Sequence, residues 1–322
     1  MNTTPMRLFA IFSPTSLRTL VIFTCAATLL LSCGGNKKPK GGSLLTGDED
    51  NQEVSKDDNS SAPPFSKEVL GDIVRSIPSP LEISFLIKDL GIKYDRGLLN
   101  TTEKANDYNT SFKQALNLGI YSTDLGYANI YGQTNDALQY LTAVKIMTDG
   151  LKIGDYFDFN TLKDLATNSN NLDSLLLVTN TSLERINEHL QKKDRADQTI
   201  LILTGGWLEA LYLTCEIAKR SPNDLLNNRI GEQKIILDQL LLLLSFYEEE
   251  FPKIKDLRND LIELQKIYNR VEITFVYEEA STKEQEGILI VEDQATSKIK
   301  FTSKDLEDIL AKSKEIRAKI TE

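Results

Sequence analysis

The sequence predicts a mainly α-helical fold, an irregular antiparallel helical bundle with a small β-hairpin or three-stranded sheet near residues 271–301. Apolar residues recur with the period of an α-helix over most of the chain after Phe65. Predicted helix starts near residues 172, 196, 223 and 252 are close enough for neighbouring helices to run antiparallel. An αα-superhelical arrangement remains the alternative, but we find no 34-residue repeat that would indicate a tetratricopeptide solenoid.

Helix-start signals define several boundaries. In Ser79-Pro80-Leu81-Glu82 and Ser221-Pro222-Asn223-Asp224, serine is the expected N-cap and proline the first helical residue. Thr302 to Asp305 forms a similar capping box without proline, and Pro252 is expected to begin a helix. The predicted helices span residues 67–76, 80–90, 106–122, 133–149, 160–168, 172–193, 196–219, 223–249, 252–270 and 303–320.

One segment has the period of a strand instead. Val271, Ile273, Phe275 and Tyr277 alternate with mainly polar residues. The short apolar segments 288–291 and 298–301 are expected to pair with it across polar loops. The sequence therefore predicts the small sheet between the last two helices.

Two stretches, 199–215 and 235–244, are apolar enough to resemble membrane spans. Glu209 and the Gly205-Gly206 pair interrupt the first, and Asp238 interrupts the second. Neither supplies the roughly 20 clean apolar residues that a spanning helix needs. Helices that are apolar nearly all round are expected in the centre of a bundle.

The N-terminus has the order of a secretory signal. Arg7 and Arg18 precede an apolar stretch that ends in Leu30-Leu31-Ser32-Cys33. The stretch is too short to span a membrane unless Arg18 is buried, which costs about 2.5–3.5 kcal/mol. We therefore assign residues 1–32 to a signal peptide.

Leu30-Leu31-Ser32-Cys33 resembles the lipobox of bacterial lipoproteins. The resemblance implies cleavage between Ser32 and Cys33, lipidation of Cys33 and attachment to a membrane through the lipid. Gly34, in place of an acidic residue, implies an outer-membrane location facing the periplasm. Residues 33–64 are then a lipidated N-terminus and polar, disordered tether, and residues 65–322 a helical domain. That domain resembles uncharacterised helical envelope lipoproteins of Gram-negative bacteria.

Charge and reactive residues exclude several functions. With 37 basic and 47 acidic residues, the net charge of −10 argues against a nucleic-acid partner. The only histidine, His189, lies near a predicted helix end, and no cysteine cluster could bind zinc or iron–sulfur. Cys215 would be the one free thiol after signal removal and lipidation, and it is expected in the core. We expect neither a metal nor a cofactor.

The sequence lacks the nucleotide-binding loops and the nucleophile elbow of common enzymes, so we predict that the chain is not an enzyme. The favoured function is a binding or scaffolding module for another envelope protein. The alternative is binding of a glycan or peptide by segment 118–140, although packing between helices is the favoured role of its tyrosines. A hydrolase using two carboxylates is the least favoured function. The candidate binding residues are Tyr121, Tyr127, Tyr131, Tyr140, Trp207 and Glu209, and Glu209 is expected either in a pocket or facing solvent.

Overall fold

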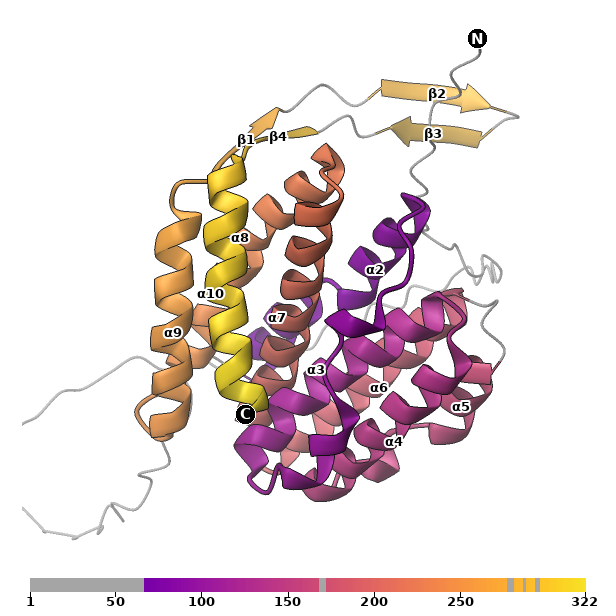
Figure 1. Ribbon diagram of the computed structural model, residues 1–322, viewed down its shortest axis with the longest axis vertical. Helices are drawn as coiled ribbons and strands as arrows, with labels where there is room; N and C mark the ends of the chain where they lie inside the picture. Colours follow the sequence, from indigo (N-terminus) through magenta and orange to yellow (C-terminus); the bar gives the residue numbers. More distant parts are fainter. Residues whose placement is uncertain (1–66, 168–171, 277–280, 286–287, 293–295) are drawn as a thin grey trace, which may run out of the picture. The chain divides into compact units, whose positions relative to one another are not determined.

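The computed structural model describes residues 67–167, 172–276, 281–285, 288–292 and 296–322. The predicted signal peptide, Cys33 and the tether lie outside the described residues, as does Tyr277. The prediction of a mainly α-helical fold with a small antiparallel sheet is confirmed (Figure 1). The α-helices are α1 (Lys67–Ser76), α2 (Pro80–Asp89), α3 (Ser111–Ile130), α4 (Thr134–Leu151), α5 (Phe159–Thr167), α6 (Leu172–Lys192), α7 (Ala196–Arg220), α8 (Asp224–Ser245), α9 (Pro252–Tyr268) and α10 (Ser303–Thr321).

Helix α7 is at the centre of the bundle. It packs along α3 and also contacts α2, α6, α8 and α10 (Figure 1). Within the described part of the chain, α7 is the one helix whose length and composition would allow it to cross a membrane, and 94% of its apolar window is buried inside the fold. The expectation of a central core helix is therefore confirmed for α7. Helix α8 buries one face and leaves Ile235 and Leu242 exposed on another.

Glycines allow α3 and α7 to approach each other closely. A Cβ added to Gly119 would lie 2.0 Å from the carbonyl oxygen of Ile202, and one added to Gly205 would lie 2.0 Å from that of Leu116. Only glycine fits a backbone contact of this kind. The α3 and α7 backbones therefore meet at Gly119, whereas Gly126 receives the side chain of Leu81.

The predicted start and end of α3 and the predicted N-cap and end of α8 are wrong. Helix α3 begins after its N-cap Thr110 rather than at residue 106, and it continues past residue 122 through Gly126. Helix α8 is capped by Asn223 rather than by Ser221. The side-chain oxygen of Asn223 accepts hydrogen bonds from the backbone amides of Leu225 and Leu226. Asparagine satisfies two free amides at once, which explains the shift. Helix α8 also ends at Ser245, so the acidic run 248–250 is a turn and not a helix end.

The strands form two antiparallel pairs. β1 (Glu272–Val276) pairs with β4 (Thr296–Lys300), as predicted, but β3 (Ile288–Glu292) pairs with β2 (Ser281–Gln285) instead of with β1. β2 is a polar segment, STKEQ, which carries no strand period and was therefore missed.

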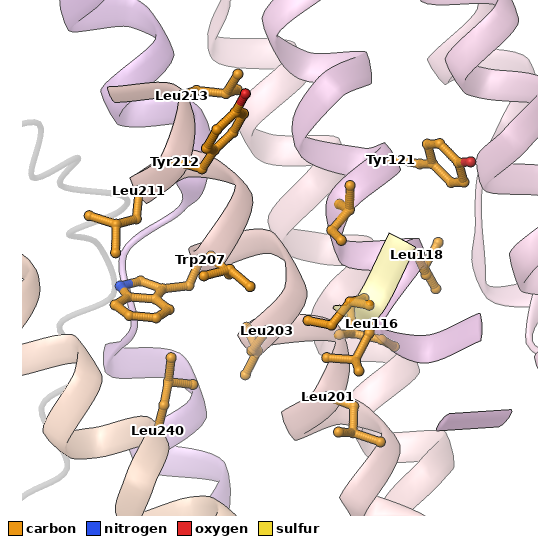
Figure 2. Packing of buried hydrophobic residues seen from close by; sticks show 14 of the residues in the cluster. Leu116, Leu118, Tyr121, Leu201, Leu203, Trp207, Leu211, Tyr212, Leu213 and Leu240 are labelled. Atoms are coloured by element: carbon orange, nitrogen blue, oxygen red, sulfur yellow. The ribbon is translucent and has the colours of Figure 1, made fainter. Parts of the chain in front are cut away.

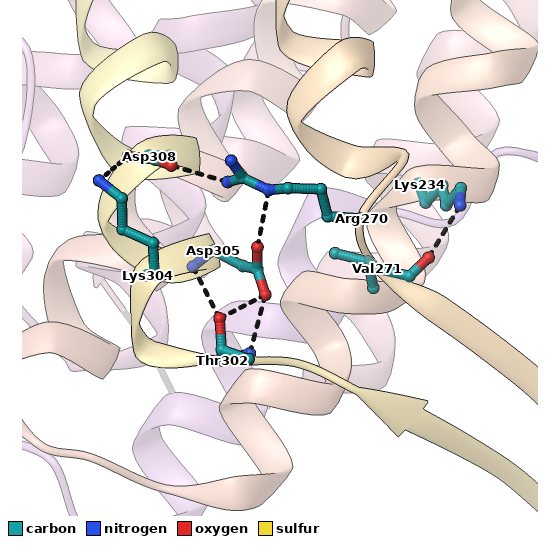
Figure 3. Close-up of polar contacts among 7 residues, drawn as sticks. All are labelled: Lys234, Arg270, Val271, Thr302, Lys304, Asp305 and Asp308. Atoms are coloured by element: carbon teal, nitrogen blue, oxygen red, sulfur yellow. Dashed lines mark hydrogen bonds and ion pairs between the residues drawn. The ribbon is translucent and has the colours of Figure 1, made fainter.

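Polar contacts anchor the β1–β4 pair to the helices. Lys234 of α8 donates to the Val271 carbonyl at 2.8 Å, just before β1 (Figure 3). After β4, Thr302 and Asp305 form the predicted capping box of α10. Arg270 binds Asp305 and Asp308 at 3.1 and 2.7 Å, which ties the end of α9 to the start of α10.

A candidate apolar ligand cavity

An apolar cavity of about 430 Å³ lies among α2, α3, α6, α7 and α8. Its size falls in the range of about 300–1,000 Å³ that is usual for small-molecule sites. Most of its walls are aliphatic. The bulky apolar residues that line it are Ile77, Pro78, Pro80, Leu81, Ile83, Leu86, Leu125, Val144, Phe157, Leu162, Leu175, Leu183, Ile186, Ile202, Leu203, Trp207, Ile235, Ile236 and Ile273. The cavity is therefore suited to a ligand that is largely hydrocarbon.

Small residues of α3 and α7 keep the cavity open. Gly119, Ser122 and Thr123 of α3 line it, and so does Gly206 of α7. The Thr123 hydroxyl donates to the carbonyl oxygens of Gly119 and Gly206 at 3.1 and 3.2 Å, so this polar group is satisfied within the wall. At these four positions the α3–α7 pair forms a floor of the cavity that carries no bulky side chain, whereas Leu125, Ile202, Leu203 and Trp207 of the same two helices line it on either side.

The cavity opens to the surface between the start of α2 and α8. Glu82, Arg229 and Ile235 line it there, and the Ile235 residue is 41% exposed. Arg229 and Glu232 form an ion pair at 2.7 Å at this opening. Charged side chains line the cavity only on this side, whereas the residues from α4, α5 and α6 are predominantly apolar.

Trp207 is the one predicted binding residue that lines the cavity. Its indole Nε1 donates to the side-chain oxygen of Gln233 at 3.0 Å, so α7 and α8 are joined beside the opening. Figure 2 shows Trp207 on the side of α7 that faces Leu240 of α8. The indole therefore combines a fixed polar tip with an apolar face toward the cavity.

The predicted tyrosine site is part of the core instead. Tyr121, Tyr127 and Tyr140 are buried, Tyr131 is half-buried, and none of the four lines the cavity. The hydroxyl of Tyr121 donates to the Thr101 carbonyl at 2.7 Å, and that of Tyr140 donates to the Asn100 carbonyl at 2.9 Å. Figure 2 shows the Tyr121 ring pointing away from α7. These tyrosines fill space between helices, as the favoured explanation for the segment predicted.

Glu209 is buried in a polar cluster that does not line the cavity. Its carboxylate accepts two hydrogen bonds from Arg317 of α10, at 2.5 and 2.8 Å. The Arg317 guanidinium also lies 4.5 Å from the centre of the Tyr212 ring. The carboxylate is completely buried and the arginine side chain is 14% exposed, so Glu209 neither faces solvent nor lines the cavity, and both expected placements are wrong. This acid holds α10 against α7.

Asp124 completes the cluster. It is buried, and its carboxylate accepts a hydrogen bond from the Asn100 amide at 3.1 Å. Burial, followed by repulsion from Glu209, raises the pKa of Asp124 well above its ordinary value, although Arg317 opposes the shift. The protonated form of Asp124 is thereby favoured in the folded protein.

We expect Asp124→Asn to gain stability relative to wild type as the pH rises from about 5 to 8. The folded wild type holds a proton that the unfolded chain releases above its ordinary pKa of about 3.9, so wild-type stability falls with rising pH through the folded pKa. An amide has no proton to lose. Denaturant unfolding of both proteins at several pH values measures the difference.

Asp124→Ala is the control for this prediction. It also removes the titration but leaves the Asn100 amide without its acceptor, which costs about 1–3 kcal/mol at every pH. Burial also raises the pKa of Asp197, to about 6, but Asp197 is present in all three proteins and cancels in the comparison. A stability difference between Asp124→Asn and wild type that does not change with pH would contradict a raised pKa.

The remaining chemically reactive residues are structural in this fold. Cys215 is buried, as predicted, and burial raises the pKa of its thiol. The His189 ring stacks on Tyr156 with centroids 4.3 Å apart, in the last turn of α6. Within the described residues, no group of three or more His, Cys, Asp or Glu side chains could hold a metal ion.

The cavity itself was not anticipated from the sequence. Its lining comes from many elements, and its aliphatic residues are of the same types as the core. The one local signal was the set of small residues on α3, which includes Gly119 and Gly126. Comparisons with protein families, with curated proteins and with solved structures found no match to this chain.

Proposed function

We propose that this chain is a lipid-anchored protein of the bacterial cell envelope whose helical domain binds an apolar small molecule. The cavity among α2, α3, α6, α7 and α8 is the observation that carries the binding function. Large apolar pockets with a few polar groups at one side are the usual form of a small-molecule site. This site replaces segment 118–140 as the location of the small-ligand alternative.

Energetics support an occupant for the cavity. Filling the cavity removes its apolar walls from water, which stabilises the folded protein by about 25 cal/mol for each Å² of apolar surface that the ligand covers. Apolar walls bind ordered water poorly, whereas an apolar ligand fills such a space readily. Ligand binding therefore supplies stability that water does not.

The proposed location rests on the N-terminal sequence. Leu30-Leu31-Ser32-Cys33 follows a basic and then an apolar segment, in the order of a lipoprotein signal. Acyl chains on Cys33 would anchor the protein stably, because two chains suffice and each buried methylene contributes about 0.8 kcal/mol. A polar tether over residues 34–64 would leave the helical domain free to take up ligands near the membrane.

Scaffolding of another envelope protein is the second candidate. Its structural support would be an exposed apolar surface, and Leu177 of α6 with Leu225 and Leu242 of α8 are the large exposed leucines of the described residues. Single exposed leucines are common on soluble domains. Ligand binding is therefore the function that the geometry supports best.

Trp207 provides the test, because it is the only tryptophan of the chain and lines the cavity. We expect bromonaphthalene, a compact apolar quencher, to reduce Trp207 fluorescence in a saturable way. The measurement uses the chain without its signal segment, residues 33–322 with Cys33→Ala, in detergent-free buffer, because the apolar stretch before Cys33 and detergents would both compete as apolar ligands. Ser182→Phe places a ring in the cavity wall and should weaken the effect by about tenfold or more.

Ser303→Phe is the matched control. Ser303 is exposed at the start of α10 and does not line the cavity, so quenching should match that of the parent chain. Circular dichroism verifies that each variant is folded. Quenching that is unsaturable, or equal in the Ser182 and Ser303 variants, would contradict binding in the cavity.

A further inference from the structure

The cavity has a polar end and an apolar end. Lining residues at the opening are exposed, and they include Pro78, Glu82 and Arg229 at the start of α2 and on α8. At the other end, Val144 of α4 and Leu162 of α5 are buried. Helices α4 and α5 lie across the α3–α7 pair from α8 (Figure 1). The cavity therefore runs between helices from a charged opening to an apolar end where Val144 and Leu162 are buried.

We propose that the ligand is an amphiphile with one linear aliphatic chain, held with the chain toward α4 and α5 and the head group at Arg229 and Glu232. This inference rests on the proposed function and specifies its ligand class. An aliphatic chain matches the aliphatic walls, and its polar head remains in contact with water and with the charged opening. A compact apolar molecule would make no polar contact with these charged side chains.

The charges at the opening define the head group. Arg229 is already paired with Glu232 at 2.7 Å, and Glu82 adds a further negative charge to the lining. The opening is therefore net negative, on a chain whose own net charge is −10. An anionic head would be repelled, whereas a neutral or zwitterionic head can hydrogen-bond to both members of the ion pair. The head group accordingly has no net negative charge.

The position of Trp207 makes the orientation measurable. The indole is tied to Gln233 of α8 by a 3.0 Å hydrogen bond, near the charged opening. We expect monoacylglycerols brominated close to the head to quench Trp207 most strongly, and those brominated at the chain end to quench it least. Residues 33–322 with Cys33→Ala are used with each lipid below its micelle concentration, so that neither the signal segment nor an acyl chain on Cys33 competes for the cavity.

Two further comparisons complete the test. Val144→Phe fills the apolar end and should shift the tightest-binding chain to a shorter length, while bromonaphthalene binding persists. A fatty acid at pH 8 should bind about tenfold more weakly than the monoacylglycerol of equal chain length. The brominated series needs no variant, so the test remains decisive if Val144→Phe does not fold.

The outcomes separate this inference from the function on which it rests. Saturable quenching by bromonaphthalene with no binding of monoacylglycerols would overturn the linear amphiphile and leave the cavity as a binding site. Quenching that is independent of bromine position, or strongest at the chain end, would overturn the orientation. Equal or tighter binding of the fatty acid would overturn the head-group assignment. If neither class of compound quenches Trp207, the binding function itself is wrong.

Discussion

Replacing Arg317 with methionine is expected to destabilise the folded chain by about 3–5 kcal/mol, because it leaves a buried carboxylate without its cation. Glu209 is completely buried and receives both of its short hydrogen bonds from Arg317. The methionine retains much of the packing of the arginine stem but supplies no donor. Denaturant unfolding at neutral pH measures the loss.

A double substitution separates the charge effect from packing. Glu209→Met combined with Arg317→Met removes both charges, so much of the lost stability should return, as it does when buried ion pairs are replaced by apolar residues. Lys266→Met is the control on an exposed ion pair with Glu263, where a change within about 0.5 kcal/mol is expected. A double variant no more stable than Arg317→Met alone would show that shape, and not charge, dominates this contact.

Local sequence signals predicted most of the fold because they act within a few residues. Ser79, Pro252 and the Thr302–Asp305 capping box mark observed helix starts. Where two caps competed, at Ser221 and Asn223, the choice depended on the number of free amides each side chain can satisfy. The choice between two possible N-caps depends on where each side chain lies relative to the free amides, which residue types alone do not determine.

The candidate site could not be predicted in the same way. Glu209 was identified as unusual, but its partner Arg317 lies 108 residues away on the last helix. The cavity wall combines residues of α2, α3, α4, α6, α7 and α8 whose types are those of any core. Whether such residues enclose a space depends on how the helices pack, which in turn depends on the glycines of α3 and α7.

Those glycines yield the second large prediction. Gly205→Ala is expected to destabilise the chain by about 3 kcal/mol or more, because its Cβ would lie 2.0 Å from the Leu116 carbonyl oxygen and force α3 and α7 apart. Neither backbone can yield without breaking helical hydrogen bonds. Thermal and denaturant unfolding of the variant measure the effect.

The adjacent Gly206 supplies the control. Its added Cβ would meet its nearest atoms, the Gly119 carbonyl and the Thr123 hydroxyl, at 3.4 Å, an ordinary contact beside the cavity. Gly206→Ala should therefore leave stability unchanged or raise it by up to about 1 kcal/mol, since alanine favours the helix. Both substitutions add one methyl group to the same turn of α7, so they differ only in the direction in which that methyl group points. Equal effects would mean that α3 and α7 do not pack in this register, and the floor of the cavity would then be lost with it.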